Sequence, residues 1–252
     1  MIDLSGKTIL VTGGSRGIGA AIVRAVGGAG ATVVLHYGRS EAAAQALQDE
    51  LPRGKCHLVQ ADLVEPDSAE RIWADATAAA GPIDALVNNA GIFEAAPLDM
   101  EIEAWRARWR RVLQVNLISP AELCRHAIID FRGRGGGRIV NVSSRAAFRG
   151  EVPEQMPYGA SKGGLVALTK TIARGYAKDG VLAFGIAPGF VATEMVSENV
   201  DAAKIAAVVA DIPLGEMADA DEIGALTAFL CSDHARHLTG ATFDVNGASY
   251  VR

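Results

Sequence analysis

The 252-residue sequence is half hydrophobic and carries a formal net charge of −5 at pH 7. A chain of this length can bury one substantial core, so we expect a single domain over residues 1–252. The acidic balance gives no electrostatic reason to bind nucleic acid or an anionic membrane surface. No stretch is apolar for long enough to span a bilayer, so no membrane partner is expected.

The three cysteines favour a reducing compartment. Cys56, Cys124 and Cys231 are far apart and show no paired spacing, so we interpret them as buried structural thiols. The first residues lack the basic region, apolar run and small-residue cleavage site of a secretion signal. A cytoplasmic location is therefore expected, and no metal site is predicted.

Short β-branched apolar runs alternate with alanine-rich helical stretches, which is typical of βαβ units that build a parallel sheet. The predicted strands are, in chain order, Thr8–Val11, Thr32–Leu35, Cys56–Gln60, Ala85–Asn88, Gly137–Val142, Val181–Ile186 and Ala241–Val245. The predicted helices are Gly19–Ala29, Glu41–Leu51, Asp67–Ala79, Ile102–Asp130, Tyr158–Lys178 and Asp221–Leu230. We predict an α/β fold, a doubly wound Rossmann-type domain with about seven parallel strands and helices on both faces.

The first predicted strand runs into a glycine-rich turn at the start of a helix. Glycine permits the tight turn and lets backbone N–H groups approach a pyrophosphate at the helix N-terminus. We therefore predict a dinucleotide-binding loop. Its predicted contacts are Gly13, Ser15, Arg16, Gly17, Ile18 and Gly19.

The end of the second predicted strand bears on the choice of cofactor. A site that prefers NAD usually carries an acid there, which binds the ribose hydroxyls. The sequence instead continues to Arg39 and Ser40 without an acid at the strand end, and Arg39 with Arg16 could clamp a 2′-phosphate. NADP(H) is therefore favoured over NAD(H). Glu41, one turn away, and the alternative that both arginines are solvated loop residues keep NAD(H) open.

Tyr158 and Lys162 lie four residues apart in a predicted helix, so their side chains share one face. A nearby ammonium group favours the phenolate, and we expect it to lower the tyrosine pKa toward neutrality. Such a pair taken alone is more often an ordinary combination of surface and core residues. The neighbouring motifs decide between these interpretations.

Together the motifs resemble the short-chain dehydrogenase/reductase family over essentially the whole chain, closest in general pattern to the 3-oxoacyl-carrier-protein reductases. The matching residues are Thr12-Gly13-x-x-x-Gly17-x-Gly19, Asn88-Asn89-Ala90-Gly91, Asn116, a serine after the fifth strand, Tyr158-x-x-x-Lys162 and Pro188-Gly189. The resemblance implies an enzyme that passes hydride between a nicotinamide cofactor and a carbonyl or secondary alcohol, with a 3-oxoacyl thioester as one candidate substrate.

The resemblance also implies a catalytic set of four residues. Tyr158 would act as general acid in reduction and as base in oxidation, and Lys162 would bind the nicotinamide ribose. Ser144, a better match than Ser143, would hydrogen-bond the substrate oxygen. Asn116 would bend a long helix and hold a water in the proton relay. Tyr158 and Lys162 are also implied as cofactor contacts, and the remaining ones are Asp62, Leu63, Asn89, Ala90, Gly91, Pro188, Gly189, Val191 and Thr193.

The substrate wall is predicted from the same motifs, with a lid over about residues 190–215. Its members are Phe93, Glu94, Arg145, Phe148, Met156, Phe190 and Met195. Arg145, directly after the candidate catalytic serine, is predicted to pair with an anionic or strongly polar substrate group. Basic residues for docking an acidic carrier protein could come from Arg132, Arg134 and Arg138, although Asp179 counts against that partner.

Trp105 and Trp109 share a helix face, and the resemblance implies that the helices beginning near Ile102 and Tyr158 pair between subunits. A homodimer or homotetramer is therefore expected. Two alternatives to an NADP(H)-dependent enzyme are an NAD-dependent dehydrogenase of a sugar, polyol or steroid alcohol, and a non-catalytic dinucleotide-sensing protein. The sensor would need none of the four catalytic residues.

Overall fold

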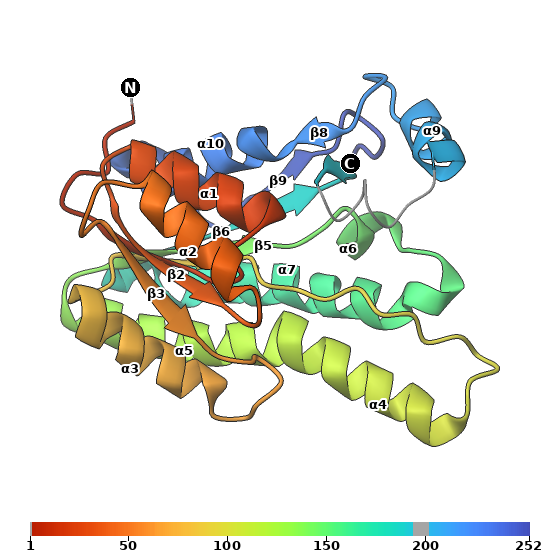
Figure 1. Ribbon diagram of the computed structural model, residues 1–252, viewed down its shortest axis with the longest axis horizontal. Coiled ribbons are helices and arrows are strands. Elements are labelled where there is room, and N and C mark those ends of the chain that lie inside the picture. Colours follow the sequence, from red (N-terminus) through yellow and green to blue (C-terminus); the bar gives the residue numbers. More distant parts are fainter. Residues whose placement is uncertain (1, 194–201) are drawn as a thin grey trace.

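The computed structural model describes residues 2–193 and 202–252. At its centre lies a seven-stranded parallel sheet in the order β3-β2-β1-β4-β5-β6-β9 (Figure 1). Its strands are β1 Thr8–Val11, β2 Thr32–Tyr37, β3 Cys56–Gln60, β4 Ala85–Asn88, β5 Gly137–Val142, β6 Val181–Pro188 and β9 Thr242–Val245. The predicted α/β fold is confirmed, and the strand order reverses between β1 and β4, where such sheets bind ligands.

Helices cover both faces of the sheet (Figure 1). One face carries α1 Gly17–Gly28, α2 Glu41–Glu50 and α10 Ala220–Cys231. The other face carries α3 Ser68–Ala80, α5 Ser119–Gly133 and α7 Met156–Tyr176, with α4 Ile102–Leu113 beside α7. Smaller elements are α6 Ala146–Arg149, α9 Ala202–Ala210 and the paired short strands β7 Val191–Ala192 and β8 Ala218–Asp219.

Side chains that alternate along each strand fill two separate cores. In β1, Ile9 and Val11 join the cluster beneath α1 and α10, whereas Leu10 joins the cluster beneath α3 and α5. All three side chains are fully buried, as expected for a parallel sheet covered on both faces. Within the described residues, no helix is both long and apolar enough to cross a membrane.

The predicted bounds hold for four strands, β1, β3, β4 and β5, while β2 and β6 each continue two residues further. The predicted long helix over Ile102–Asp130 is interrupted by a π-helical turn at Gln114–Ile118. The short helix α6 and the helix α9 were not predicted. The sheet therefore follows the sequence pattern closely, and the differences lie around the groove described next.

Candidate active site

A groove of about 580 Å³ lies beyond the carboxyl ends of β1 and β4. Most of the predicted cofactor residues line it, although they come from five separate segments of the chain. These residues are Gly13, Ser15, Arg16, Gly17, Ile18, Gly19, Arg39, Ser40, Asp62, Leu63, Asn89, Ala90, Gly91 and Thr193. The fold thus brings residues that are up to 180 positions apart in the sequence (13 to 193) around one cavity.

The other predicted cofactor contacts are not part of the lining of this groove: Tyr158, Lys162, Pro188, Gly189 and Val191. Pro188 and Gly189 lie beside β9, where the Gly189 N–H donates to the carbonyl of Val245 at 2.8 Å, and Val191 lies in β7, which pairs with β8. The carbonyl of Pro188 accepts from the N–H of Arg145 at 2.9 Å, and Val191 is buried.

Several residues of the groove were missed by the sequence prediction. Four of them are sequence neighbours of predicted residues, so their position next to a strand end was the signal that could have found them: Gly38, Ala61, Ile92 and Val64. Arg111 and Val115 reach the groove through the packing of α4 and the π-helical turn, and the expected bend at Asn116 does not reveal that these side chains line it. The last of the missed residues, His36, has a structural role that is described below.

The glycine-rich loop is shaped to accept an anion. Gly13 and Gly17 adopt left-handed backbone angles, with φ of +63° and +53°, which side chains disfavour. Helix α1 begins at Gly17 without a side-chain cap and without an acidic residue in its first turn. Its first N–H groups and its positive dipole end are therefore available to a phosphate. These features fit a bound dinucleotide.

His36 connects the glycine-rich loop to the end of β3. Its Nδ1 accepts a hydrogen bond from the N–H of Gly13 at 3.2 Å, and its Nε2 lies 3.1 Å from the carbonyl oxygen of Ala61. Both contacts are satisfied by a neutral imidazole with its proton on Nε2. Burial lowers the pKa of His36 to about 4, so this neutral form persists at physiological pH.

Acidification is expected to weaken the fold through His36. Because its folded pKa of about 4 lies below the ordinary 6.5, the unfolded chain takes up the proton first as the pH falls. The stabilisation is complete above pH 6.5 and is lost toward pH 4, by up to about 3 kcal/mol. Urea unfolding between these two pH values should show a smaller loss in a His36→Asn variant. Equal losses in both proteins would contradict this assignment.

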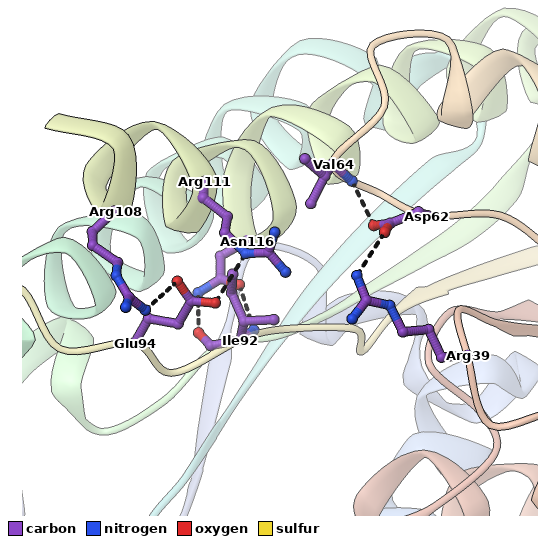
Figure 2. Close-up of polar contacts among 8 residues, drawn as sticks. All are labelled: Arg39, Asp62, Val64, Ile92, Glu94, Arg108, Arg111 and Asn116. Carbon is purple, nitrogen blue, oxygen red and sulfur yellow. Dashed lines mark hydrogen bonds and ion pairs between the residues drawn. The ribbon is translucent and has the colours of Figure 1, made fainter. Parts of the chain in front are cut away.

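Arg39 and Asp62 form an ion pair across the groove (Figure 2). The Arg39 Nη2 lies 3.4 Å from Oδ2 of Asp62, whose Oδ1 accepts from the N–H of Val64 at 3.1 Å. The Arg39 side chain is 80% exposed, and such solvated pairs contribute little stability. Arg39 can therefore exchange this carboxylate for another anion at low cost.

Asn116 sits in the π-helical turn, and its side chain reaches back to the loop after β4 (Figure 2). The amide accepts from the N–H of Ile92 at 2.8 Å and donates to its carbonyl at 2.9 Å. It also donates to Ser161 at 3.1 Å, next to Lys162 on α7. Pro120 follows the turn and has no N–H to donate to the carbonyl of Asn116, which favours this interruption.

The side chains of Ser144, Tyr158 and Lys162 meet where β5 ends and α7 begins. Ser144 makes a hydrogen bond with Tyr158, and the Lys162 Nζ lies 5.7 Å from the centre of the Tyr158 ring. Lys162 also donates to the carbonyl of Val142 at 2.9 Å. Ser143 points elsewhere, because its hydroxyl donates to the carbonyl of Lys162 at 2.9 Å. Only the second serine is thus placed against Tyr158.

The electrostatics of this cluster differ from the sequence-based expectation. Burial raises the pKa of Tyr158 above its usual 10, and the hydrogen bond with Ser144 offsets this only in part. The predicted lowering of the Tyr158 pKa was therefore wrong, since desolvation of the phenolate outweighs the other influences. Burial also lowers the pKa of Lys162 to about 8. At neutral pH, Tyr158 carries its proton and Lys162 its charge.

Gly91 completes the connection between this cluster and the groove. A Cβ atom at Gly91 would lie 3.4 Å from both the Asn116 Oδ1 and the Lys162 Nζ. Gly91 lines the groove, so Asn116 and Lys162 stand directly beside it, although neither they nor Tyr158 belong to the lining. A dinucleotide that begins at the glycine-rich loop can end beside the phenol.

Arg145 does not face open solvent beside Ser144. It is 5% exposed, donates to the Ser249 hydroxyl at 2.6 Å, and places its guanidinium 4.5 Å from the centre of the Phe190 ring. The predicted pairing with a substrate anion is corrected accordingly, because the C-terminal segment already engages this side chain. Phe148 likewise packs under the guanidinium of Arg252, at 3.8 Å.

One member of the predicted substrate wall, Phe93, contacts the catalytic cluster. Phe93 packs its ring edge against Tyr158, with 4.8 Å between the ring centres, and Met156 is 38% exposed. Glu94 pairs with two arginines of α4. Met195 lies outside the described residues, as do residues 194–201 of the predicted lid.

The three arginines considered for carrier docking lie far from this site. Arg138 is the second residue of β5, so the group stands at the amino ends of the strands, opposite the groove. Each is also paired: Arg132 with Asp179, Arg134 with Asp130 and Arg138 with Asp233. The prediction that they stand near the active site was wrong, because a glycine-rich sequence does not reveal which edge of the sheet it adjoins.

Comparison with known proteins agrees with this geometry. The family model described as enoyl-(acyl carrier protein) reductase matches residues 13–248. A 3-oxoacyl-[acyl-carrier-protein] reductase of Synechocystis is 36% identical, with 98% of each chain covered. A 3β-hydroxysteroid dehydrogenase of Eggerthella lenta is 38% identical, with 97% of this chain and 94% of the relative covered.

The solved structures show the same likeness. One is described as an NAD(P)-dependent gluconate 5-dehydrogenase of Beutenbergia cavernae with NADP bound at low occupancy. It superimposes with a TM-score of 0.89 at 34% identity, and 98% of each chain is covered. This chain therefore belongs to the short-chain dehydrogenase/reductase family, the nicotinamide-dependent oxidoreductases that act on hydroxyl and keto groups.

Proposed function

We propose that this enzyme reduces carbonyl compounds with NADPH. The observation that carries the proposal is the Tyr158 phenol, which burial keeps protonated beside Ser144 and Lys162 where the dinucleotide groove ends. A protonated phenol is the form that donates to a carbonyl oxygen during reduction. In the reverse direction the group must first lose its proton, and its raised pKa makes the phenolate scarcer at neutral pH.

The residues divide the chemistry between them. The bound nicotinamide supplies or accepts the hydride at the carbonyl carbon. Tyr158 gives its proton to the carbonyl oxygen, and the Ser144 hydroxyl donates a hydrogen bond to that oxygen as negative charge develops. The Lys162 ammonium binds ribose hydroxyls and stabilises the phenolate left behind. Asn116 fixes the loop at Ile92 and, through the proposed water, would resupply the proton.

Arg39 supports a preference for NADPH over NADH, because it is exposed at the adenine end of the groove and only weakly paired. Arg39→Ala is expected to raise the dissociation constant of NADPH about 10- to 100-fold, through loss of a charge-assisted hydrogen bond. NADH has no 2′-phosphate, so its dissociation constant should stay within about twofold. Fluorescence titration of both cofactors measures the two effects. Equal weakening of both would place Arg39 outside the recognition of the 2′-phosphate.

The substrate is tested by following NADPH and NADH absorbance with a panel of carbonyl compounds. The panel holds simple ketones, 3-oxoacyl thioesters on coenzyme A and on a carrier protein, 3-oxosteroids and keto sugar acids, after the activities named for the relatives. We expect turnover with at least one of them, faster with NADPH than with NADH. Tight NADP(H) binding without turnover of any compound would favour the dinucleotide sensor instead.

We further propose a homodimer or homotetramer. Ile102, Ile118 and Ile129 are between 42% and 58% exposed along α4 and α5 and the turn between them. On the same helix the rings of Trp105 and Trp109 pack together and remain partly exposed, with 5.2 Å between their centres. Both features suit a surface that a second copy covers. Sedimentation velocity tests this assembly.

The cysteines support the predicted cytoplasmic location. Cys56, Cys124 and Cys231 are all buried and unpaired. Burial raises the pKa of Cys124 and of Cys231 to about 12, so these thiols are unreactive structural groups. Unpaired buried thiols are typical of proteins that work in a reducing compartment.

A further inference from the structure

The ring of Phe93 stands exposed beside the proposed proton donor. It is 56% exposed, yet its edge packs on the Tyr158 ring with 4.8 Å between the ring centres and an angle of 78° between the planes. It directly follows Ile92, which lines the cofactor groove. A substrate whose carbonyl reaches the Tyr158 hydroxyl therefore comes within contact distance of this phenyl ring.

A second loop adds apolar side chains at the same place. Val152 and Met156, in the segment between Ser144 and Tyr158, are 56% and 38% exposed. The two loops are joined, because the N–H of Ala96 donates to the carbonyl of Glu154 at 2.7 Å. The phenol is thus flanked by two loops that are hydrogen-bonded to each other and that expose apolar side chains, although Glu151 of the second loop also acts on it electrostatically.

The backbone that carries Phe93 is fixed on both sides (Figure 2). Before it, the amide of Asn116 binds both the N–H and the carbonyl of Ile92. After it, the carboxylate of Glu94 pairs with Arg108 at 3.1 Å and with Arg111 at 2.9 Å, both on α4. An aromatic ring held in this way loses little freedom when a ligand packs against it.

We propose that Phe93 determines substrate specificity by packing against a flat or bulky apolar group next to the reacting carbonyl, and that Glu94 is the residue that positions it. The inference rests on the proposed carbonyl reduction. It assigns to this enzyme aryl and other apolar ketones in preference to small ketones without such a group.

Kinetic comparison of an aryl ketone with acetone tests the inference. Phe93→Ala should lower kcat/KM for the aryl ketone about 10- to 100-fold, the range expected for an apolar pocket contact. The value for acetone should change less than about threefold. The kcat/KM of Phe93→Leu for the aryl ketone should lie between the values for wild type and Phe93→Ala. Leu98→Ala removes another apolar side chain of the same loop, which is 77% exposed. This variant should leave kcat/KM unchanged for both ketones.

Glu94→Gln keeps the size of the side chain but removes its charge. Glu94→Gln should reduce the preference for the aryl ketone, as Phe93→Ala does. We expect a higher KM for the aryl ketone, whereas kcat for acetone should stay unchanged. A Glu94→Asp variant, which retains the charge, should restore part of the preference. Loss of activity with both ketones to the same extent would make Phe93 and Glu94 merely structural and overturn the inference.

Binding of an aryl ketone, followed by isothermal titration calorimetry in the presence of NADP⁺, separates this inference from the proposed function because the oxidised cofactor has no hydride to give and no turnover takes place. Weaker binding to Phe93→Ala, with unchanged binding to Leu98→Ala, would support the apolar contact even if reduction failed for every ketone. Equal affinity of wild type and Phe93→Ala would overturn it, even in an enzyme that reduces ketones readily.

Discussion

Tyr158→Phe is expected to lower kcat/KM for NADPH-dependent carbonyl reduction by about 10²- to 10⁴-fold. The substitution removes only the hydroxyl that gives the proton, and it retains the ring against which Phe93 packs. The Lys162 ammonium keeps its hydrogen bond to the carbonyl of Val142, so the NADPH dissociation constant should remain nearly unchanged. Stopped-flow reduction and a fluorescence titration of NADPH measure the two quantities separately.

Tyr176→Phe provides the matched control, because Tyr176 is the last residue of the same helix α7. Its ring contacts the guanidinium of Arg132 at the opposite end of the molecule from the groove. This variant should reduce substrate at the wild-type rate. If Tyr158→Phe also retained that rate, the proton would come from another group and the proposed role of Tyr158 would be wrong. Equal losses in both variants would point to instability of α7.

The fold was predictable because its signals are local. Each strand is a short apolar run bounded by turn residues, so the bounds of β1, β3, β4 and β5 agree with the pattern. The break in the predicted helix over Ile102–Asp130 was expected at Asn116 and is favoured locally by Pro120, but the side chain of Asn116 there contacts Ile92, 24 residues away. A periodicity confined to one segment cannot reveal such a contact.

The motifs indicate which residues gather around the groove better than they indicate the chemistry of those residues. The spacing of Tyr158 and Lys162 placed both on one helix face, but the pKa of Tyr158 depends on desolvation by the surrounding fold. The same holds for Arg145, whose partners Ser249 and Phe190 lie 104 and 45 residues further along the chain (249 − 145 and 190 − 145). Sequence motifs identify the chemical groups, whereas their burial and partners follow from tertiary packing.

Gly19→Ala is expected to disrupt the dinucleotide site more than any other single methyl group added to helix α1. A Cβ atom at Gly19 would lie 2.0 Å from the carbonyl oxygen of Gly13 and 2.6 Å from the Asn89 Nδ2. Backbone cannot yield to that overlap without moving the loop whose N–H groups face the phosphates. We expect a loss of about 1–3 kcal/mol of stability and a roughly 10- to 100-fold weaker affinity for NADP(H).

Gly28→Ala, at the other end of α1, is the control for this substitution. Nothing lies within 4 Å of a Cβ atom at Gly28, and alanine is the better helix former by about 1 kcal/mol. The control should therefore be as stable as wild type or more stable, with the same affinity for NADP(H). Calorimetric titration measures the affinity of both variants for NADP(H), and thermal unfolding measures their stability. Equal affinity of Gly19→Ala and Gly28→Ala for NADP(H) would contradict this prediction. It would mean that the phosphate site does not depend on the close approach of α1 to the loop at Gly13.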